Sequence, residues 1–599
     1  MFYIGKSAMK QHIYILISIT AIFSCSQPLT NQNIKNRDLE ISTKDILDHI
    51  KYLSADERQG RFPGSKGSKE TIKYIIDEFK NVSIQPAGID GYTQPFDFTT
   101  GIQLSGVNTL SVNKKIYNVN KDYIPLEFSS NGNVSGGLTF VGYGYTINDS
   151  IDWDDYNNID VENRWVMILR GGPDGDHPHS KFVSHNPLRK KAMLARDNQA
   201  AGVLFVDFED GGELIPLKHT PNSTAIGIPV LQVSRKVADQ LVSAQLNMLQ
   251  TKLDEKKQSQ SYSLNIQISA DVKLKKQIVN VPNVIGIIPG SDPVLRDEYI
   301  ILGAHFDHLG FGGQGTGSLA LDSSAIHNGA DDNASGTAGI LELSKKLSSN
   351  RKNLKRSILL MAYNAEEQGL LGSKYYVNNP TVSLSATAAM INMDMIGRMS
   401  EGKVIVGGTG TSPEFESILN EINKDHGIHL KMSQEGYGPS DHASFYVNNI
   451  PVLFFFTGTH MDYHKPSDDW QHINVAGQKQ IVDLIYDLTI KLSNQATKPL
   501  FSQAGPKTPT QTRRSFKVTF GVIPSYGSDA EGMEIDGAKK EGPAGKAGMQ
   551  KGDVITSIGG KEIKNIYDYM YRLEELKPGE TVEVKVLRAG KTLTLKVNF

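Results

Sequence analysis

Two histidines and three carboxylates lie in five short polar segments of the chain. They are, in chain order, His305, Asp332, Glu367, Asp394 and His464. Histidine nitrogen and carboxylate oxygen are donors that zinc prefers, and paired catalytic metal ions lie about 3.5–4 Å apart. Glu366 precedes Glu367 and is left over as a base for a water molecule. The donor set therefore predicts a two-zinc centre able to hydrolyse an amide.

Asp332 is the best candidate for the carboxylate that both metal ions share. It lies in the turn Gly329-Ala330-Asp331-Asp332-Asn333, just before a helix predicted to begin near Ser335. A tight glycine-containing turn exposes the carboxylate, and the helix that follows fixes its position. We therefore expect Asp332 to bridge the two ions.

The segment that carries these ligands, residues 275–495, alternates predicted strands and helices. The strands are 283–288, 298–303, 357–363, 386–393 and 452–456, and the helices are 335–347, 413–424 and 477–492. Short apolar runs are typical of buried parallel strands, and their alternation with helices predicts an α/β fold, a mixed sheet flanked by helices on both faces. Side chains that follow strand ends meet at the carboxyl edge of such a sheet. Residues 26–105, with helical periodicity from 45 to 81, are expected to complete this domain.

Each of the five predicted ligands lies in a short sequence motif. The motifs are His305-x-Asp307, Gly329-Ala-x-Asp332-x-x-Ser-Gly, Asn364-Ala-Glu-Glu-x-Gly, Asn392-x-Asp394-x-x-Gly and Tyr463-His-x-Pro-x-Asp468. In this order they resemble the co-catalytic dizinc aminopeptidase family, which also contains glutamate carboxypeptidases and glutaminyl cyclases. The resemblance covers residues 45–105 and 275–495. It implies one zinc ion on His305, Asp332 and Asp394, and a second on Asp332, Glu367 and His464.

The same resemblance implies roles for three further residues. Glu366 would be the general base for a zinc-bridging hydroxide that attacks the first peptide carbonyl. Asp307 would orient His305 through its ring N–H, and Tyr463 would donate to the developing oxyanion. The family often has a cis peptide bond after its bridging aspartate, so the bond between Asp332 and Asn333 is expected to be cis.

Other polar residues near the motifs are not expected to bind metal. His308 and His327 flank the motifs and are interpreted as polar neighbours of the site. The pair Asp441-His442, within Gly-Pro-Ser-Asp-His-Ala-Ser-Phe, also resembles a family motif and is expected to support the site from nearby.

Residues 106–274 contain none of the predicted ligands. Their sequence predicts short strands around 138–141, 165–169, 202–206 and 228–233, with one helix at 189–200. We interpret the segment as an inserted domain. Its Val141-Gly142-Tyr143-Gly144 and the strand–helix–strand pattern around Gly202 resemble the protease-associated domain found within some zinc peptidases.

The C-terminal part begins after a linker rich in Pro, Thr, Gln and Ser at residues 496–515. In residues 516–599, Phe520-Gly521-Val522 and Lys551-Gly552-Asp553-Val554-Ile555 resemble the PDZ domains of bacterial proteases. The resemblance implies that backbone N–H groups near Phe520 receive the carboxylate of a peptide C-terminus, and the peptide adds as a strand. An alternative is that this domain docks only within its own chain.

The first 25 residues resemble a bacterial lipoprotein signal peptide. Lys6 and Lys10 precede an apolar stretch, 13–23, which is too short to span a bilayer, and Ser24 precedes Cys25. We expect an exported protein of the periplasm or cell surface, lipid-anchored at Cys25, with 26–40 as a tether. The alternative is a plain signal peptide. Cys25 is the only cysteine, so no internal disulfide is possible, and a net charge of −2 gives no reason to expect nucleic acid as a partner.

The leading hypothesis is therefore a secreted dizinc aminopeptidase that hydrolyses N-terminal residues from peptide substrates. One alternative is a carboxypeptidase or dipeptidase of the same superfamily, in which a cation such as Arg398 would grip a substrate carboxylate. A glutaminyl cyclase fits less well, because that branch uses one zinc ion and both ligand sets are complete here. The alternative from another class is a non-catalytic peptide-binding receptor.

Overall fold

The computed structural model places most of the chain. The residues that it describes are 39–148, 151–175, 180–207, 212–218, 225–243, 245–313, 316–321, 323–505, 518–524, 530, 532–538, 540, 542–563, 569, 572–573 and 576–599. The predicted signal peptide with Cys25, nearly all of the predicted tether and the end of the predicted linker lie outside these residues. None of the helices within the described ranges is long and apolar enough to cross a membrane.

The predicted ligands lie around a nine-stranded mixed sheet in the order β1-β13-β15-β14-β16-β19-β17-β18, with β2 beside β13. The strands are β1 Gln85–Pro86, β2 Thr93–Leu104, β13 Leu274–Ile288, β14 Tyr299–His305, β15 Ser357–Tyr363, β16 Thr387–Met393, β17 Lys403–Gly407, β18 His429–Met432 and β19 Val452–Phe456. The four central strands, β15, β14, β16 and β19, run parallel to one another. β13 and β17 flank this group, and each is antiparallel to the central strand beside it. The predicted mixed α/β sheet is therefore confirmed, and each predicted strand is present.

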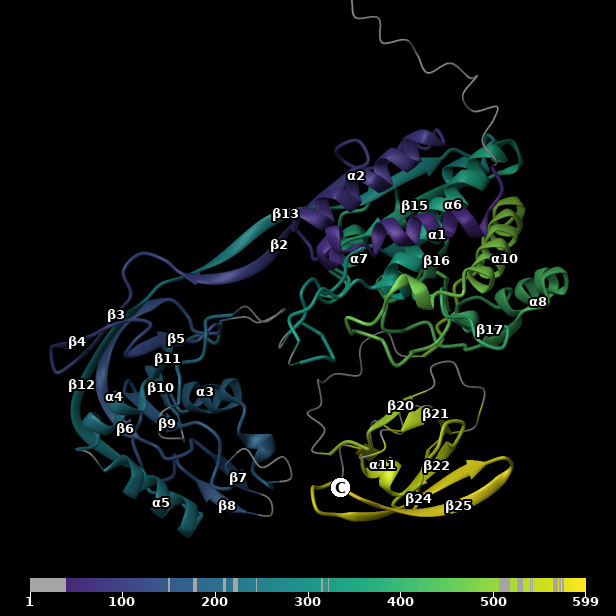
Figure 1. The fold of residues 1–599 in the computed structure, drawn as a ribbon. Helices are drawn as coiled ribbons and strands as arrows, with labels where there is room; N and C mark the ends of the chain where they lie inside the picture. The colour runs from purple at the N-terminus through teal and green to yellow at the C-terminus, as the bar shows by residue number, and fades with distance from the viewer. Residues whose placement is uncertain are drawn as a thin grey trace, which may run out of the picture. The chain divides into compact units, whose positions relative to one another are not determined.

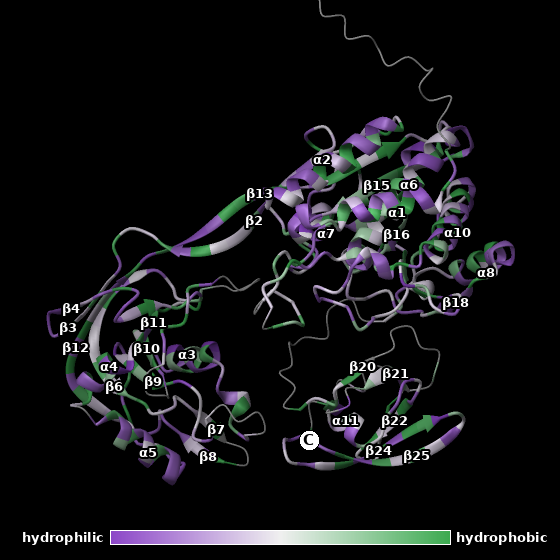
Figure 2. Cartoon of the chain, in the orientation of Figure 1, coloured by the Kyte–Doolittle hydropathy of each residue, from purple (hydrophilic) through white to green (hydrophobic). Residues whose placement is uncertain are grey.

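Helices cover both faces of this sheet. One face packs against α1 Thr43–Leu53, α2 Lys66–Asn81, α6 Gly336–Ser349, α8 Phe415–His426 and α10 Val475–Asn494, and the other against α7 Leu371–Asn378 and α9 His442–Tyr446. Alternation along the strands explains the two cores: Ile300 and Leu302 join the first and Ile301 the second. Figure 2 shows green and purple alternating along α1 and α10, as expected for helices with one apolar side.

The segment between β2 and β13 forms a sheet of its own, in the order β4-β3-β12-β6-β9-β10-β11-β5. Its strands are β3 Thr109–Val112, β4 Lys115–Tyr117, β5 Tyr123–Pro125, β6 Gly132–Phe140, β9 Trp165–Leu169, β10 Gly202–Val206, β11 Val230–Val233 and β12 Tyr262–Val272, with helices α3 Leu188–Asp197, α4 Arg235–Leu241 and α5 Leu246–Lys256. A separate apolar core fills it. The chain leaves the first sheet along β2 and returns along β13, which pair side by side (Figure 1).

The C-terminal segment also has its own sheet and core. Its strands are β20 Val522–Pro524, β21 Met533–Ala538, β22 Val554–Ile558, β23 Lys561–Glu562, β24 Thr581–Arg588 and β25 Lys591–Asn598, with a short helix α11 Pro543–Lys546. Phe520, Met549 and Val584 are among the buried residues of this core.

Candidate metal centre

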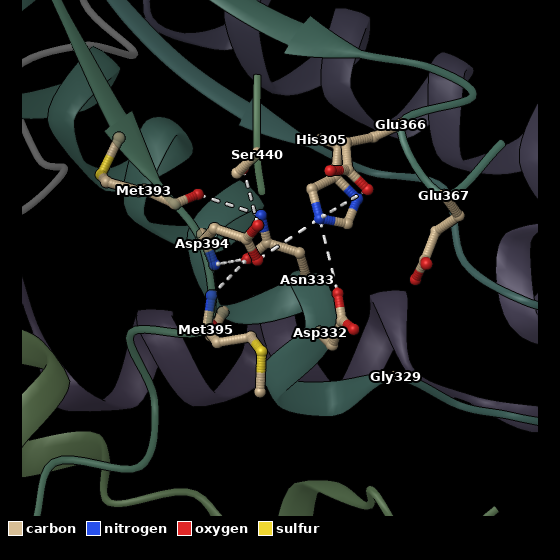
Figure 3. A network of polar contacts seen from close by, with 12 residues as sticks. His305, Gly329, Asp332, Asn333, Glu366, Glu367, Met393, Asp394, Met395 and Ser440 are labelled. Carbon is tan, nitrogen blue, oxygen red and sulfur yellow. Dashed lines mark hydrogen bonds and ion pairs between the residues drawn. The ribbon is translucent and has the colours of Figure 1, made fainter. Parts of the chain in front are cut away.

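All five predicted ligands converge at the carboxyl edge of the central strands. His305 ends β14, Asp394 directly follows β16, and Glu367 lies four residues after β15. Asp332 lies in the turn before α6, and His464 lies in the loop after β19. Neighbouring parallel strands end at the same edge, so motifs far apart in the sequence meet there. Figure 3 shows the His305 ring pointing toward both Asp332 and Asp394.

The ligands form two clusters that share Asp332. In the first cluster, His305 Nε2 lies 3.4 Å from Asp332 Oδ1 and 3.4 Å from Asp394 Oδ1. In the second cluster, His464 Nε2 lies 3.2 Å from Asp332 Oδ2 and 3.2 Å from Glu367 Oε2. The two oxygens of one carboxylate therefore face two different histidines, which is the arrangement of a bridging ligand.

These distances fit two zinc ions. Zinc bonds of about 2.0–2.2 Å in a tetrahedron place neighbouring donor atoms about 3.3–3.6 Å apart. The four measured separations lie at or just below that spacing. In addition, Asp394 Oδ1 is buried and has no hydrogen-bond partner among the described residues, although Oδ2 accepts from Ser440. A buried carboxylate oxygen without a partner is costly, and a cation at this point would supply one.

Both histidines are held in the tautomer that metal binding requires. His305 Nδ1 is 3.2 Å from the main-chain carbonyl of Asp307, and His464 Nδ1 is 2.8 Å from the carbonyl of Gly317. A carbonyl only accepts, so each Nδ1 carries the proton and donates it. Each Nε2 is then left with a lone pair directed at the carboxylates.

Asp307 contacts His305 as the resemblance implies, but through its main chain. Its carboxylate oxygen is 3.8 Å from the His305 ring, beyond hydrogen-bond distance. The carboxylate accepts instead from the backbone N–H groups of Glu366 at 3.0 Å and Glu367 at 3.4 Å. Asp307 therefore ties the segment after β14 to the glutamate pair after β15.

The two adjacent glutamates have opposite electrostatic surroundings. Burial raises the pKa of Glu366 well above its ordinary value, against the opposing effect of His305. Burial also acts to raise the pKa of Glu367, but His464 and His308 outweigh it and hold that pKa well below its ordinary value. Neighbouring carboxyl groups whose pKa values are pushed apart are suited to different roles. Glu366 Oε2 lies 3.9 Å from His305 Nε2, beside the first cluster.

The turn that carries Asp332 is fixed by a second aspartate. Asp468 Oδ2 accepts hydrogen bonds from the backbone N–H groups of Asp331 and Asp332 at 2.9 and 3.1 Å. The peptide bond between Asp332 and Asn333 is cis, as predicted. Asp468 closes the Tyr463 motif in the sequence, but the motif by itself does not indicate this role.

Arg61 binds main-chain carbonyls of the segments around the centre, a role that the sequence does not reveal. It is fully buried, and its guanidinium donates to the carbonyls of Phe306 at 2.7 Å, Gly329 at 2.8 Å, Asn328 at 2.6 Å and Leu53 at 2.8 Å. Burial lowers the pKa of Arg61 to about 10, and nearby carboxylates, Asp332 first among them, oppose this. The only sequence signal is its loop, 60–65, whose glycines and proline are typical of a plain connection.

The remaining predicted residues also lie close to the centre. The Tyr463 ring stacks on His464 with ring centroids 3.8 Å apart, and burial raises the pKa of its phenol well above the ordinary value. His327 contacts Ser318 and the carbonyl of Ala325. His308, expected to be a polar neighbour, directly contacts the predicted ligand Glu367.

The pair Asp441-His442 follows Ser440, whose hydroxyl donates to Asp394 Oδ2 at 2.7 Å. Burial raises the pKa of Asp441 to about 7. The His442 ring stacks on Phe454, and burial lowers the pKa of His442 to about 3. The pair therefore lies beside the centre, as expected, while Ser440 makes the contact to a predicted ligand.

Comparison with known proteins identifies two families along the chain. A family model described as Peptidase family M28 matches residues 283–489, and a PDZ domain model matches residues 525–599. Leucine aminopeptidase 2 from Arthroderma otae is 30% identical over 447 residues, which cover 72% of this chain and 76% of that protein. Leupeptin-inactivating enzyme 1 from Streptomyces exfoliatus is 32% identical over 184 residues, 31% of this chain and 37% of that enzyme.

Among solved structures, a zinc aminopeptidase from Bacillus subtilis is 22% identical, with a TM-score of 0.44, over 78% of this chain and 100% of that one. The chain spans 33 to 60% of the length of the first three curated relatives that it matches.

Proposed function

This chain belongs to peptidase family M28, and we propose on that premise that it is a zinc aminopeptidase that uses two metal ions to remove N-terminal residues from peptides. The observation that carries the proposal is the position of the Asp332 carboxylate, in which Oδ1 faces His305 and Oδ2 faces His464. Residues for one ion would be His305, Asp332 and Asp394, and residues for the other Asp332, Glu367 and His464. The chemistry that two zinc ions supply in such a centre is Lewis acidity, which polarises a carbonyl group and lowers the pKa of water.

Glu366 is the general base of the proposed reaction. It lies beside the first cluster, and its backbone N–H is bound by Asp307, so its position is set by a neighbouring loop. Its carboxylate would accept a proton from the attacking water and return it to the leaving amine. Tyr463 is the proposed donor to the oxyanion, because its ring packs directly on the ring of His464.

The carboxypeptidase or dipeptidase alternative receives less support from the surroundings of Arg398. Its guanidinium donates to Asp462 at 3.1 Å and to Asp468 at 3.2 Å, two carboxylates of the chain itself. A cation already paired with two carboxylates is poorly suited to gripping the carboxylate of a substrate. The names of the relatives, a leucine aminopeptidase among them, point in the same direction.

One experiment separates these possibilities. Zinc content per chain is measured on the purified protein, and amino-acid anilides are assayed beside peptides with a blocked N-terminus. An aminopeptidase should bind about two zinc ions, one for each of the clusters around His305 and His464, and should cleave the anilides and spare the blocked peptides. Cleavage of blocked peptides from the C-terminus would support the carboxypeptidase alternative, and absence of zinc would support the receptor.

The remaining proposals concern the other parts of the chain. We propose that residues 106–274 are a protease-associated domain and that the PDZ domain binds peptide C-termini. We also propose that the protein is exported and lipid-anchored at Cys25, as Lys6, the apolar stretch 13–23 and Ser24 suggest. Replacing Cys25 with Ser should release the protein from the membrane fraction, and unchanged membrane association would contradict the anchor.

A further inference from the structure

His308 makes a close polar contact to a predicted metal ligand. The ring is fully buried, and its Nδ1 lies 2.6 Å from Glu367 Oε1. The other oxygen of the same carboxylate, Oε2, lies 3.2 Å from His464 Nε2. The two oxygens of Glu367 thus face different histidines, one that is a predicted ligand and one that is not.

The contact between His308 and Glu367 has the length of a hydrogen bond and not of two donors on one ion. Donor atoms that share a tetrahedral zinc are about 3.3–3.6 Å apart, which follows from bonds of about 2.0–2.2 Å. A separation of 2.6 Å is shorter than this and fits a charge-assisted hydrogen bond. Since a carboxylate accepts, His308 Nδ1 donates to Glu367 Oε1.

Among the described residues, the hydrogen bond to Glu367 is the one that positions the His308 ring. Its Nε2 is buried and finds no partner in the part of the chain that the structure describes. Close packing fixes the ring in place, because a Cβ added at Gly329 would lie 2.5 Å from His308 Cδ2. The ring also meets His464 edge-on, with centroids 5.9 Å apart. A polar ring held this tightly, with its Nδ1 hydrogen-bonded to a predicted ligand, points to a task at that residue.

We propose that His308 is a positioning residue that holds Glu367 in the orientation needed to bind the second metal ion, an inference that rests on the proposed two-metal function. The segment after β14 then serves both clusters. His305 lies in the first cluster, and three residues later His308 orients a ligand of the second cluster. Groups that orient metal ligands in this way raise metal affinity by about 10- to 100-fold.

The test measures the affinity of each cluster for zinc by titration and the spectrum of the cobalt-substituted protein. His308→Leu removes the donor, His308→Asn places an amide N–H where Nδ1 was, and His327→Leu is the control, since His327 contacts Ser318 and Ala325 instead of a ligand. In His308→Leu the second ion should bind about 10- to 100-fold more weakly while the first binds normally. His308→Asn should restore most of this loss, and His327→Leu should leave both affinities unchanged.

The outcomes separate the inference from the proposed function. If the unaltered protein binds no zinc, the two-metal function fails. If the unaltered protein binds two ions and His308→Leu binds both as tightly, the role of His308 alone is overturned. Should the leucine variant fail to fold by circular dichroism, His308→Asn is compared with His308→Gln, whose amide lies farther from the backbone. Equal zinc affinities in those two variants would also contradict the proposal.

Discussion

Glu366 and Glu367 are adjacent in the chain, yet their carboxylates lie beside different clusters. Glu366 Oε2 lies 3.9 Å from His305, whereas Glu367 Oε2 lies 3.2 Å from His464. Asp307 binds the backbone N–H groups of both residues and so fixes the turn between them. In the proposed function this arrangement would divide the tasks of metal ligand and base between neighbours, so that each task can be removed by a separate substitution.

Replacing Glu366 with Gln should separate catalysis from metal binding. The variant keeps the size of the side chain but loses the base, so kcat should fall by about 10²- to 10⁴-fold while zinc content stays at its normal value. Zinc analysis and anilide kinetics check this. Glu367→Gln is the matched control, because it should weaken binding of the second ion. A Glu366→Gln variant with near-normal kcat would exclude this residue as the base.

Replacing Asp332 should disturb both metal ions, because its two oxygens face His305 and His464. Asp332→Ala should bind neither ion tightly, whereas His464→Ala should lose only the second. Elemental analysis after dialysis against a weak chelator gives the zinc content of each variant. If Asp332→Ala and His464→Ala retained the same zinc content, the bridging role would be contradicted.

Replacing Arg61 with Met should destabilise the domain that contains the metal centre. The change removes the donors for four main-chain carbonyls, those of Leu53, Phe306, Asn328 and Gly329, and the cost should be about 3–5 kcal/mol of unfolding free energy. Urea unfolding followed by far-ultraviolet circular dichroism measures it. Arg296→Met is the control: its side chain is 61% exposed, so the change should stay within about 0.5 kcal/mol. Equal losses of unfolding free energy in the two variants would contradict a stabilising role for the hydrogen bonds of Arg61.

His442 should make the protein sensitive to acid. Burial lowers its pKa to about 3, whereas a histidine in an unfolded chain has a pKa of about 6.5. Between these values only the unfolded chain binds the proton, so the stabilisation present above pH 6.5 is lost as the pH falls toward 3. His442→Phe keeps a ring against Phe454 and should flatten the curve of melting temperature against pH in this range. Parallel curves for the two proteins would show that His442 does not cause the dependence.

The metal centre could be predicted from the sequence at positions where a candidate ligand follows a predicted strand. Each of β14, β15 and β16 is a short apolar run followed by a polar motif, so residue order alone places His305, Glu367 and Asp394 at one edge of the sheet. Strand β17 and the edge strand β18 are absent from the strands that the sequence predicts. In β18 no residue is fully buried, so it lacks the apolar run that marks the central strands.

Arg61 and the role of His308 could not be predicted, because each depends on contacts that are distant in sequence. Arg61 donates to carbonyls that lie 245 to 268 residues later in the chain. His308 stands next to a recognised motif, but its role follows from the direction of its ring toward Glu367, which residue spacing does not encode. The carboxylate of Asp307 is a similar case, since it lies 3.8 Å from the His305 ring and accepts from the backbone N–H groups of Glu366 and Glu367 instead.

The pairing of β2 with β13 makes the inserted segment removable. Leu104 lies opposite Leu274, and the N–H of Ser105 donates to the carbonyl of Lys273 at 2.9 Å, so the two ends of the insertion are already neighbours. Antiparallel strands at this separation can be joined by a two-residue turn. Excising residues 105–273 and closing the ribbon with Asn-Gly should therefore leave a shorter chain that still assembles the metal centre. In such a protein, differences in the range of peptides accepted would measure directly what the insertion contributes.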